Sequence, residues 1–152
     1  MGVSVKVEGL RDLEAELDKL TTAAGKGALR RAGRKSAEPL AELMRQGAPR
    51  DEGDLEASIG VSTKLSPRQR KLHRKTIGND KSAIEIFVGA GPLPQAHLKE
   101  FGTFAMAPEP FVRPAWDQDR KALLDRLRAA LWDEVQKSVT RAERKAAKAA
   151  QG

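Results

Sequence analysis

The sequence predicts an α+β fold, in which a small antiparallel sheet with a long-loop hairpin is packed by N-terminal helices and a long C-terminal helix. Two observations support the sheet: apolar residues alternate over 59–65 and again over 84–88, with a basic stretch between them. A third supports the helices, because apolar residues recur at steps of three and four near both ends of the chain. A chain of 152 residues has the length of one domain with one modest core.

The N-terminal region predicts a strand and then a helix. Valines alternate with polar residues over 3–7, which is the period of a short half-buried strand that ends at Gly9. The helix that follows has acidic residues near its start, where they favour the helix dipole. Its apolar positions are Leu10, Leu13, Leu17 and Leu20.

A second helix is expected over about 28–46. Gly25 and Gly27 are expected to break the chain before it. Pro39 lies inside the helix, and an interior proline costs about 3 kcal/mol or more unless the helix bends or begins there. We therefore expect this element to be bent or to be divided near Glu38.

The middle of the chain predicts the hairpin. The second helix ends at Gly47-Ala48-Pro49, and the polar run 50–54 forms a turn before the strand at 59–65. The strand at 84–88 is expected to pair with it. Between them, residues 64–81 form a basic hairpin loop with seven cations and one acid, which nearly accounts for the chain's net charge of +7.

The last third predicts a short helical segment, an extended connection and a long helix. Residues 96–101 form one or two helical turns, and Gly102 fits the left-handed position after a helix end. The long helix begins near Pro114 and runs past Val139. Because its apolar residues step by four, the apolar stripe rotates around the helix and one flat partner does not cover it. Its first half should pack on the domain, and its second half should face another subunit or solvent.

A single α+β domain is expected over 1–140, followed by a basic C-terminal tail at 141–152. The tail contains four cations and one acid, and it has no bulky apolar residue to anchor it. We expect it to be solvated or to become ordered on a partner.

The sequence lacks the patterns of an enzyme or a metal site. It has no cysteine and only two histidines, His73 and His97. His97 and Glu100 form the best acid–base pair, at helical spacing, but no nucleophile motif or phosphate-binding glycine loop accompanies them. We expect no enzymatic activity, no cofactor and no metal. No apolar run approaches the roughly 18 residues of a membrane span, so we also expect a soluble protein without membrane contact.

The basic hairpin loop is a candidate contact surface for a partner or for DNA. Its central cations are Arg68, Arg70, Lys71, Arg74 and Lys75. They could neutralise nucleic-acid phosphates, without sequence preference, because the loop has no aromatic residue for base stacking. The alternatives are docking on an acidic ring of a neighbouring protein and a merely solvated hairpin tip.

Several motifs together resemble a known family. They are Val7-Glu8-Gly9-Leu10, Ala48-Pro49 followed by Gly53, Leu55 and Ser58-Ile59, Glu100-Phe101-Gly102-Thr103, and Pro110-Phe111-Val112-Arg113-Pro114-Ala115. In order and spacing they resemble the neck and tail-completion family of long-tailed bacteriophages, over nearly the whole chain. The resemblance implies a structural virion protein of the neck or upper tail, assembled in the host cytoplasm, that completes the tail and joins it to the head.

The family resemblance also implies partners. Identical subunits would form a homo-oligomeric ring, expected as a hexamer, between head-side connector proteins and tail-terminator or tail-tube proteins, with non-specific contact to packaged DNA as a further expectation. Two related roles remain alternatives: a tail-terminator ring that caps the tail tube, and a head-side connector. Outside this class, the alternative is a non-specific DNA-binding protein that uses the basic hairpin loop.

The motif residues supply candidates for the subunit or ring interface. These are Glu100, Phe101, Phe104, Phe111, Arg113 and Trp116. Phe101 and Phe111 are expected either in the core or in a subunit contact. Arg113 is expected to pair with Glu100 or with a carboxylate of the adjacent subunit.

Overall fold

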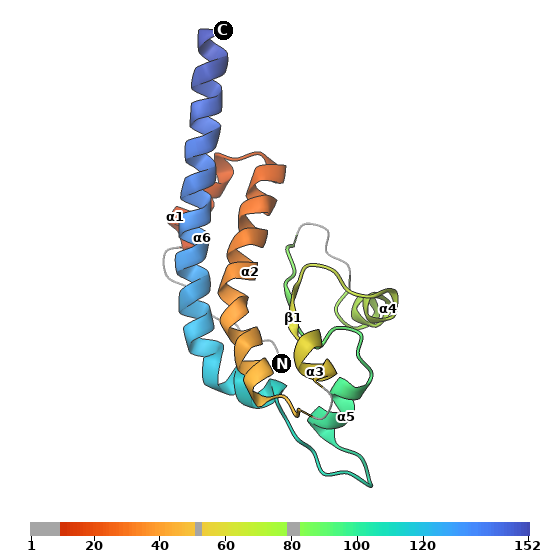
Figure 1. The fold of residues 1–152 in the computed structure, drawn as a ribbon. Coiled ribbons are helices and arrows are strands. Elements are labelled where there is room, and N and C mark those ends of the chain that lie inside the picture. Colours follow the sequence, from red (N-terminus) through yellow and green to blue (C-terminus); the bar gives the residue numbers. More distant parts are fainter. Residues whose placement is uncertain (1–9, 51–52, 79–82) are drawn as a thin grey trace.

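The computed structural model describes residues 10–50, 53–78 and 83–152. Its elements, in chain order, are α1 (Leu10–Asp18), α2 (Thr22–Gly47), α3 (Asp54–Ser58), β1 (Gly60–Ser62), α4 (Pro67–Thr76), β2 (Phe87–Gly89), α5 (Gln95–Phe101) and α6 (Val112–Gln151). The long helices α2 and α6 lie side by side, and the sheet with the short helices α3, α4 and α5 lies beside α2 (Figure 1). The predicted combination of N-terminal helices, small antiparallel sheet and long C-terminal helix is confirmed, in a mostly helical molecule.

Helix α2 starts earlier than the sequence indicated and is not divided. The side chain of Thr21 caps it by accepting a hydrogen bond from the amide of Ala24 at 3.3 Å. Gly25 therefore lies inside the helix, so the prediction of a break before residue 28 is wrong, and the helix also continues through Pro39. Packing of a face of small residues outweighs these unfavourable propensities. The buried residues of α2 are Ala28, Ala32, Gly33, Ser36, Ala37, Leu40, Ala41 and Met44.

The sheet consists of β1 and β2, which pair antiparallel with Val61 opposite Val88. The predicted pairing is confirmed, but both strands are shorter than predicted. After β1, the hydroxyl of Ser62 bonds the backbone of Lys64, and this local turn competes with further strand pairing. The strand predicted at 3–7 lies outside the described residues.

Helix α4 corrects the prediction of a basic hairpin loop, since most of that segment is helical. Ser66 caps the helix and forms a capping box with Gln69, and Pro67 occupies the first turn. The short helix α3 begins at Asp54, the last residue of the polar run predicted as a turn. Helix α5 agrees with the helical turns predicted at 96–101.

The core has two parts along the α2–α6 pair. One joins the C-terminal half of α2 to α3, the sheet and the start of α6, and Phe111 is its largest fully buried side chain. The other joins α1, α2 and the middle of α6, where Ala28 packs with Val135 and Val139. The predicted leucine face of α1 contributes to this second part through Leu13 and Leu17.

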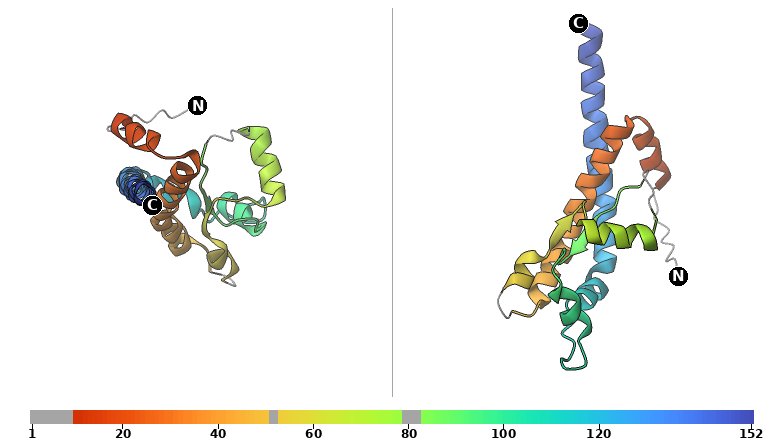
Figure 2. Two further views of the ribbon diagram at one scale, coloured as in Figure 1. Left: turned by 90° about the horizontal axis from the view of Figure 1, so that it is seen from above. Right: turned by 90° about the vertical axis from the view of Figure 1, so that its right-hand side faces the viewer.

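The end of α6 extends beyond the rest of the molecule (Figure 2). The helix is continuous to Gln151, and every residue from 140 on is exposed. Packing of α6 on the domain reaches Val139, which is further along the helix than the predicted first half. The basic tail expected at 141–152 is thus almost entirely helical, because alanine, arginine, lysine and glutamine favour a helix that is already nucleated.

Candidate interaction site

The carboxylate of Glu100 joins the end of α5 to the start of α6. Its Oε2 accepts hydrogen bonds from the backbone amides of Phe111 at 2.7 Å and Val112 at 3.0 Å. Its Oε1 accepts from the amide and the Nε of Arg113, both at 3.0 Å. Amides at a helix start lack intrahelical partners and carry partial positive charge. Glu100 therefore caps α6 from a different helix.

Two opposing effects act on the pKa of Glu100. Burial raises it, because Glu100 is only 4% exposed and a charged carboxylate is less favourable away from water. The amides of Val112, Arg113 and Phe111 and the Arg113 guanidinium lower it by bonding the charged form. The hydrogen bonds outweigh burial, so the pKa lies below its ordinary value and the carboxylate is ionised at neutral pH.

Arg113 connects this carboxylate to an exposed aromatic ring. Its Nη2 donates to the backbone oxygen of Glu100 at 2.9 Å, in addition to the bond from its Nε. Its guanidinium carbon lies 5.0 Å from the centroid of the Phe101 ring, a cation–π contact. Of the two partners expected for Arg113, the structure contains the first, Glu100 of the same chain.

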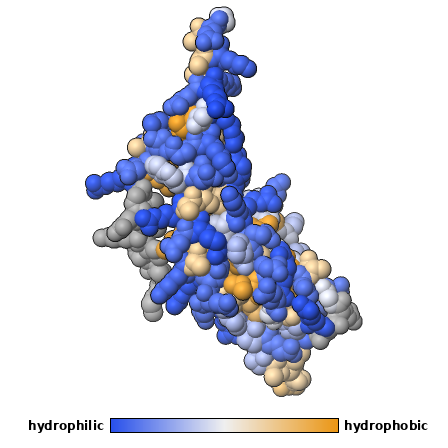
Figure 3. All heavy atoms as spheres, turned by 60° about the vertical axis from the view of Figure 1, so that its left-hand side comes forward, coloured by the Kyte–Doolittle hydropathy of each residue, from blue (hydrophilic) through white to orange (hydrophobic). Residues whose placement is uncertain are grey.

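Residues 102–110 form a tight projecting turn, here called the aromatic arm. Gly102 has φ +74°, and a Cβ there would lie 2.8 Å from the backbone oxygen of Met106, so only glycine fits without strain. Thr103 and Met106 exchange backbone hydrogen bonds of 2.8 and 3.3 Å across the turn. Phe104, between them, is fully exposed. The arm forms the lowest part of the molecule in Figure 1, and its tip has hydrophobic colour in Figure 3.

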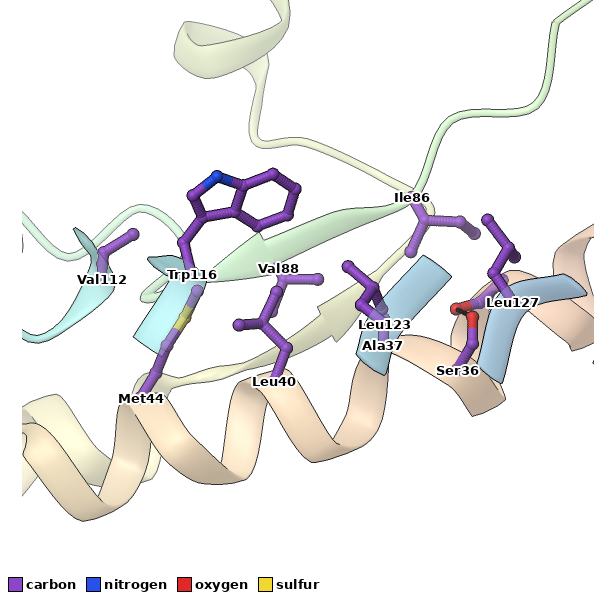
Figure 4. A pocket seen from close by; sticks show the side chains of 11 residues that line it. Ser36, Ala37, Leu40, Met44, Ile86, Val88, Val112, Trp116, Leu123 and Leu127 are labelled. Atoms are coloured by element: carbon purple, nitrogen blue, oxygen red, sulfur yellow. Dashed lines mark hydrogen bonds between the residues drawn. The ribbon is translucent and has the colours of Figure 1, made fainter. Parts of the chain in front are cut away.

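An apolar groove lies between α2, β2 and α6, apart from the aromatic arm. It has a volume of about 380 Å³, and Trp116, 47% exposed, lies at one end of it (Figure 4). Its lining residues are Gly33, Ser36, Ala37, Leu40, Met44, Ile86, Val88, Val112, Trp116, Leu123 and Leu127. The six predicted interface residues thus separate. Glu100, Phe101 and Arg113 lie together, Phe104 projects on the arm, Phe111 fills the core and Trp116 borders the groove.

Sequence reasoning missed the polar contacts that hold α6 against α2. Arg126 donates to both carboxylate oxygens of Asp119, at 2.9 and 2.6 Å, and to the backbone oxygen of Ser36. Farther along, Arg31 of α2 bonds Glu134 of α6 at 2.8 Å. The sequence offered one indication of these contacts. The acids Asp119 and Glu134 lie near the apolar stripe of the last helix, where an acid indicates a buried ion pair rather than a solvated face.

The five central cations of the predicted basic hairpin loop lie on α4, whereas Lys64 precedes this helix and Lys81 lies outside the described residues. Arg68, Arg70, Lys71, Arg74 and Lys75 are exposed. The inward side of the helix carries Gln69, which donates to the backbone oxygen of Gly91 at 2.6 Å, and His73, whose Nε2 lies 2.9 Å from Glu85 Oε1. The five cations are therefore exposed on the side of α4 opposite Gln69 and His73.

The structure also bears on the acid–base pair and the metal site considered from the sequence. Glu100 uses both carboxylate oxygens for amides and Arg113, whereas His97 is exposed, so the pair considered for acid–base chemistry is not assembled. The described residues contain no group of three or more histidine, cysteine or acidic side chains placed to hold a metal. Within the same residues, no helix has the length and apolar character needed to cross a membrane.

Comparison with known proteins assigns the chain to a family. A family model described as "Bacteriophage HK97-gp10, putative tail-component" matches residues 11–102, which is more than half of the chain and extends from α1 to the end of α5. No curated protein and no solved structure gives a significant match. The matched region includes the Gly53–Ile59 and Glu100–Gly102 motifs, so the family agrees with the resemblance carried by those residues. The chain therefore belongs to the HK97-gp10-like family of bacteriophage tail components, which are structural proteins of the virion.

Proposed function

We propose that this tail component forms a ring of identical subunits in the phage neck, with six as the expected number, that completes the tail and joins it to the head. Membership of a tail-component family supports the location. The observation that carries the ring is the aromatic arm, which holds Phe104 in solvent on the same chain as a separate apolar groove.

The aromatic arm has the properties of a preformed binding anchor. Phe104 is fully exposed, and Phe101 at its base is 65% exposed. An exposed aromatic side chain does not add to the stability of the fold through burial, whereas an aromatic anchor in a partner's pocket contributes strongly to binding affinity. Because the hydrogen bonds of Thr103 and Met106 already fix the turn, little further ordering is required on contact.

The groove gives this anchor a receptor on a second copy of the chain. Its volume of about 380 Å³ and its apolar lining suit an aromatic side chain, and Trp116 at its edge adds ring surface. The arm and the groove are different surfaces, so their contact is head-to-tail rather than two-fold. Head-to-tail contacts produce a closed ring when the rotation between subunits divides a full turn.

The test compares Phe104→Ala with Leu72→Ala, which removes another exposed apolar side chain, on α4. Each purified protein is measured for mass in solution, alone and mixed with tails that lack their upper end. We expect both variants to fold with unchanged stability. The Leu72 variant should join tails as a ring, and the Phe104 variant should join at least tenfold less efficiently.

Three outcomes would contradict the proposal or its details. Normal tail joining by Phe104→Ala would remove the arm as the ring contact. A wild-type protein that ignores such tails would contradict the neck role itself. A ring that blocks further growth of the tail tube before any head is added would indicate the tail-terminator role instead.

A further inference from the structure

We propose that the outward face of α4 is a binding surface for duplex DNA, which it contacts through the phosphate backbone without reading sequence. Five cations lie on this ten-residue helix, and it contains no acidic residue. Neither the ring contact nor the capping of α6 uses these side chains. The inference goes beyond the proposed function, because it concerns a ligand of the single subunit.

The cations occupy one side of α4. At 100° per residue, Arg70, Arg74, Lys71, Lys75 and Arg68 fall within an arc of about 160°. Gln69 and His73 lie on the opposite side of the helix, and they are the two residues of α4 that are partly buried. The five cations therefore share the side of α4 that lies opposite its partly buried residues.

The helix holds this arrangement before any ligand arrives. The capping box of Ser66 and Gln69 defines its start, and Gln69 also bonds Gly91 beyond β2. His73 lies 2.9 Å from Glu85 and packs edge-on against Phe87 of β2, with 5.4 Å between ring centroids. These inward contacts fix the position of α4 on the sheet, and Arg70 adds a bond from its Nη2 to the backbone oxygen of Leu65 at 3.3 Å.

Those cations have no carboxylate partner within the described parts of the chain. Elsewhere, arginines of the same molecule pair closely with acids, as Arg126 does with Asp119 and Arg45 with Glu42. Five unpaired like charges on one short helix repel one another, and a polyanion would relieve that repulsion. Arginine side chains also match phosphate geometry, and three of the five cations are arginines.

The composition of the surface favours duplex DNA over other anionic partners. Protein interfaces have an apolar core depleted in charge, whereas this face has cations at its centre and exposed apolar residues, Leu72 and Ile77, only at its two edges. Interfaces with DNA are more polar and far more positive. The outward face also lacks aromatic side chains, which single-stranded nucleic acid requires for stacking.

Helix length sets a quantitative expectation. Ten residues span about 15 Å, along which a duplex carries about nine phosphate charges. If three to five cations contact phosphates, the logarithm of the binding constant should fall with the logarithm of salt concentration at a slope of about −2.7 to −4.5.

The experiment measures binding of the full-length protein to a fluorescein-labelled 30-base-pair duplex by anisotropy, in about 50 to 200 mM KCl, where such contacts are strongly salt-dependent. One variant carries Lys71→Gln, Arg74→Gln and Lys75→Gln. Its matched control carries Arg141→Gln, Arg144→Gln and Lys145→Gln, which removes the same charge from the exposed end of α6. We expect the α4 variant to lose about 2.7 from the magnitude of the slope, about 0.9 for each cation, and the control to lose less than 1.

Each other result would overturn the inference. Equal losses in both variants would mean that net charge alone attracts DNA. No measurable binding at the lowest salt, or binding of poly-glutamate as tight as that of the duplex, would mean that DNA is not the ligand. Tighter binding to single strands than to duplex would exclude the duplex as the preferred form. The measurement uses free subunits, so failure here leaves the ring proposal standing.

Discussion

At the scale of single residues, Glu100 determines how the aromatic arm leaves the domain. Its carboxylate fixes the start of α6 directly after the arm. Just before it in α5, the backbone oxygen of Lys99 accepts from the amide of Glu109 at 2.7 Å. These bonds hold the C-terminal end of the arm to α5, and the amide of Gly102 holds its other end by donating to the backbone oxygen of Leu98 at 2.7 Å. Phe104 is thus directed outward without help from a neighbouring subunit.

Glu100→Gln should destabilise the fold and change its response to acid. At neutral pH the amide group cannot accept on both sides, so buried donors lose their partner at a cost of about 2 kcal/mol. The folded-state pKa of Glu100 lies below its ordinary value of 4.5, so the carboxylate's contribution is complete above that value and is lost as pH falls through the folded pKa. Urea unfolding at several pH values from 7 to 3 measures both effects.

The stability difference between wild type and Glu100→Gln should therefore shrink below pH 4.5. Glu109→Gln is the matched control, because this exposed glutamate lies 3.9 Å from Lys99 and should change stability by less than about 0.5 kcal/mol. Parallel pH profiles for wild type and Glu100→Gln would show that the carboxylate does not stabilise the folded state through its charge.

At the scale of elements, one glycine sets how closely the sheet approaches α2. A Cβ at Gly33 would lie 2.6 Å from Cγ1 of Ile86, just before β2, so the glycine makes room for that side chain. Such overpacking costs about 1–3 kcal/mol, whereas alanine in a helix is favoured over glycine by about 1 kcal/mol. Gly33→Ala should thus lower the free energy of unfolding by about 1 kcal/mol.

The sign of that effect should reverse when Ile86 is shortened. In an Ile86→Ala background the added methyl group has space, so Gly33→Ala should be neutral or stabilising in a double-mutant cycle measured by denaturant unfolding. Gly25→Ala is the control, because its nearest neighbour would be Leu17 Cδ2 at 3.8 Å and only the helix preference acts. Destabilisation of equal size in both backgrounds would show that the close approach does not limit packing.

The elements that the sequence predicts well are those with a local pattern. Leucine spacing predicts α1, and alternation on either side of the basic segment predicts the antiparallel pairing of β1 and β2. The sequence also contains a signal for helix α4, because Ser66, Pro67 and Gln69 are typical of a helix start, but the high density of charge favoured the prediction of a loop. The early start of α2 could not be predicted from local pattern, because packing on α6 outweighs the low helix propensity of its glycines.

The candidate site was predicted only where it depends on a local sequence pattern. The motif around 100–115 identifies the segment, and Glu100 was one of the two partners expected for Arg113. The opposite positions of Phe104 in solvent and Phe111 in the core depend on a turn closed by long-range bonds to α5. Residue spacing contains no information on those bonds, so the direction of each aromatic ring could not be predicted.

At the scale of the whole molecule, α2 and α6 form a stem with different surfaces at its two ends. The aromatic arm lies at one end, and the basic end of α6 projects from the other (Figures 1 and 2). Between these ends, the Arg31–Glu134 pair and the bonds from Arg126 to the backbone oxygen of Ser36 join α2 and α6. A subunit of this shape can contact a neighbour at the arm and a further protein layer at the helix end.

Deletion of residues 141–152 should separate folding from assembly. None of these residues is buried, so the melting temperature should stay within about 2 °C of wild type, whereas deletion of 135–152 removes Val135 and Val139 from the core and should destabilise the fold by more than 2 kcal/mol. The four cations of the free helix end are available to an acidic or anionic layer of the neck. The shorter deletion should therefore still form rings on tails but join heads poorly, which electron microscopy of the reconstituted particles measures. Normal head joining by this variant would show that the projecting helix is dispensable for the neck.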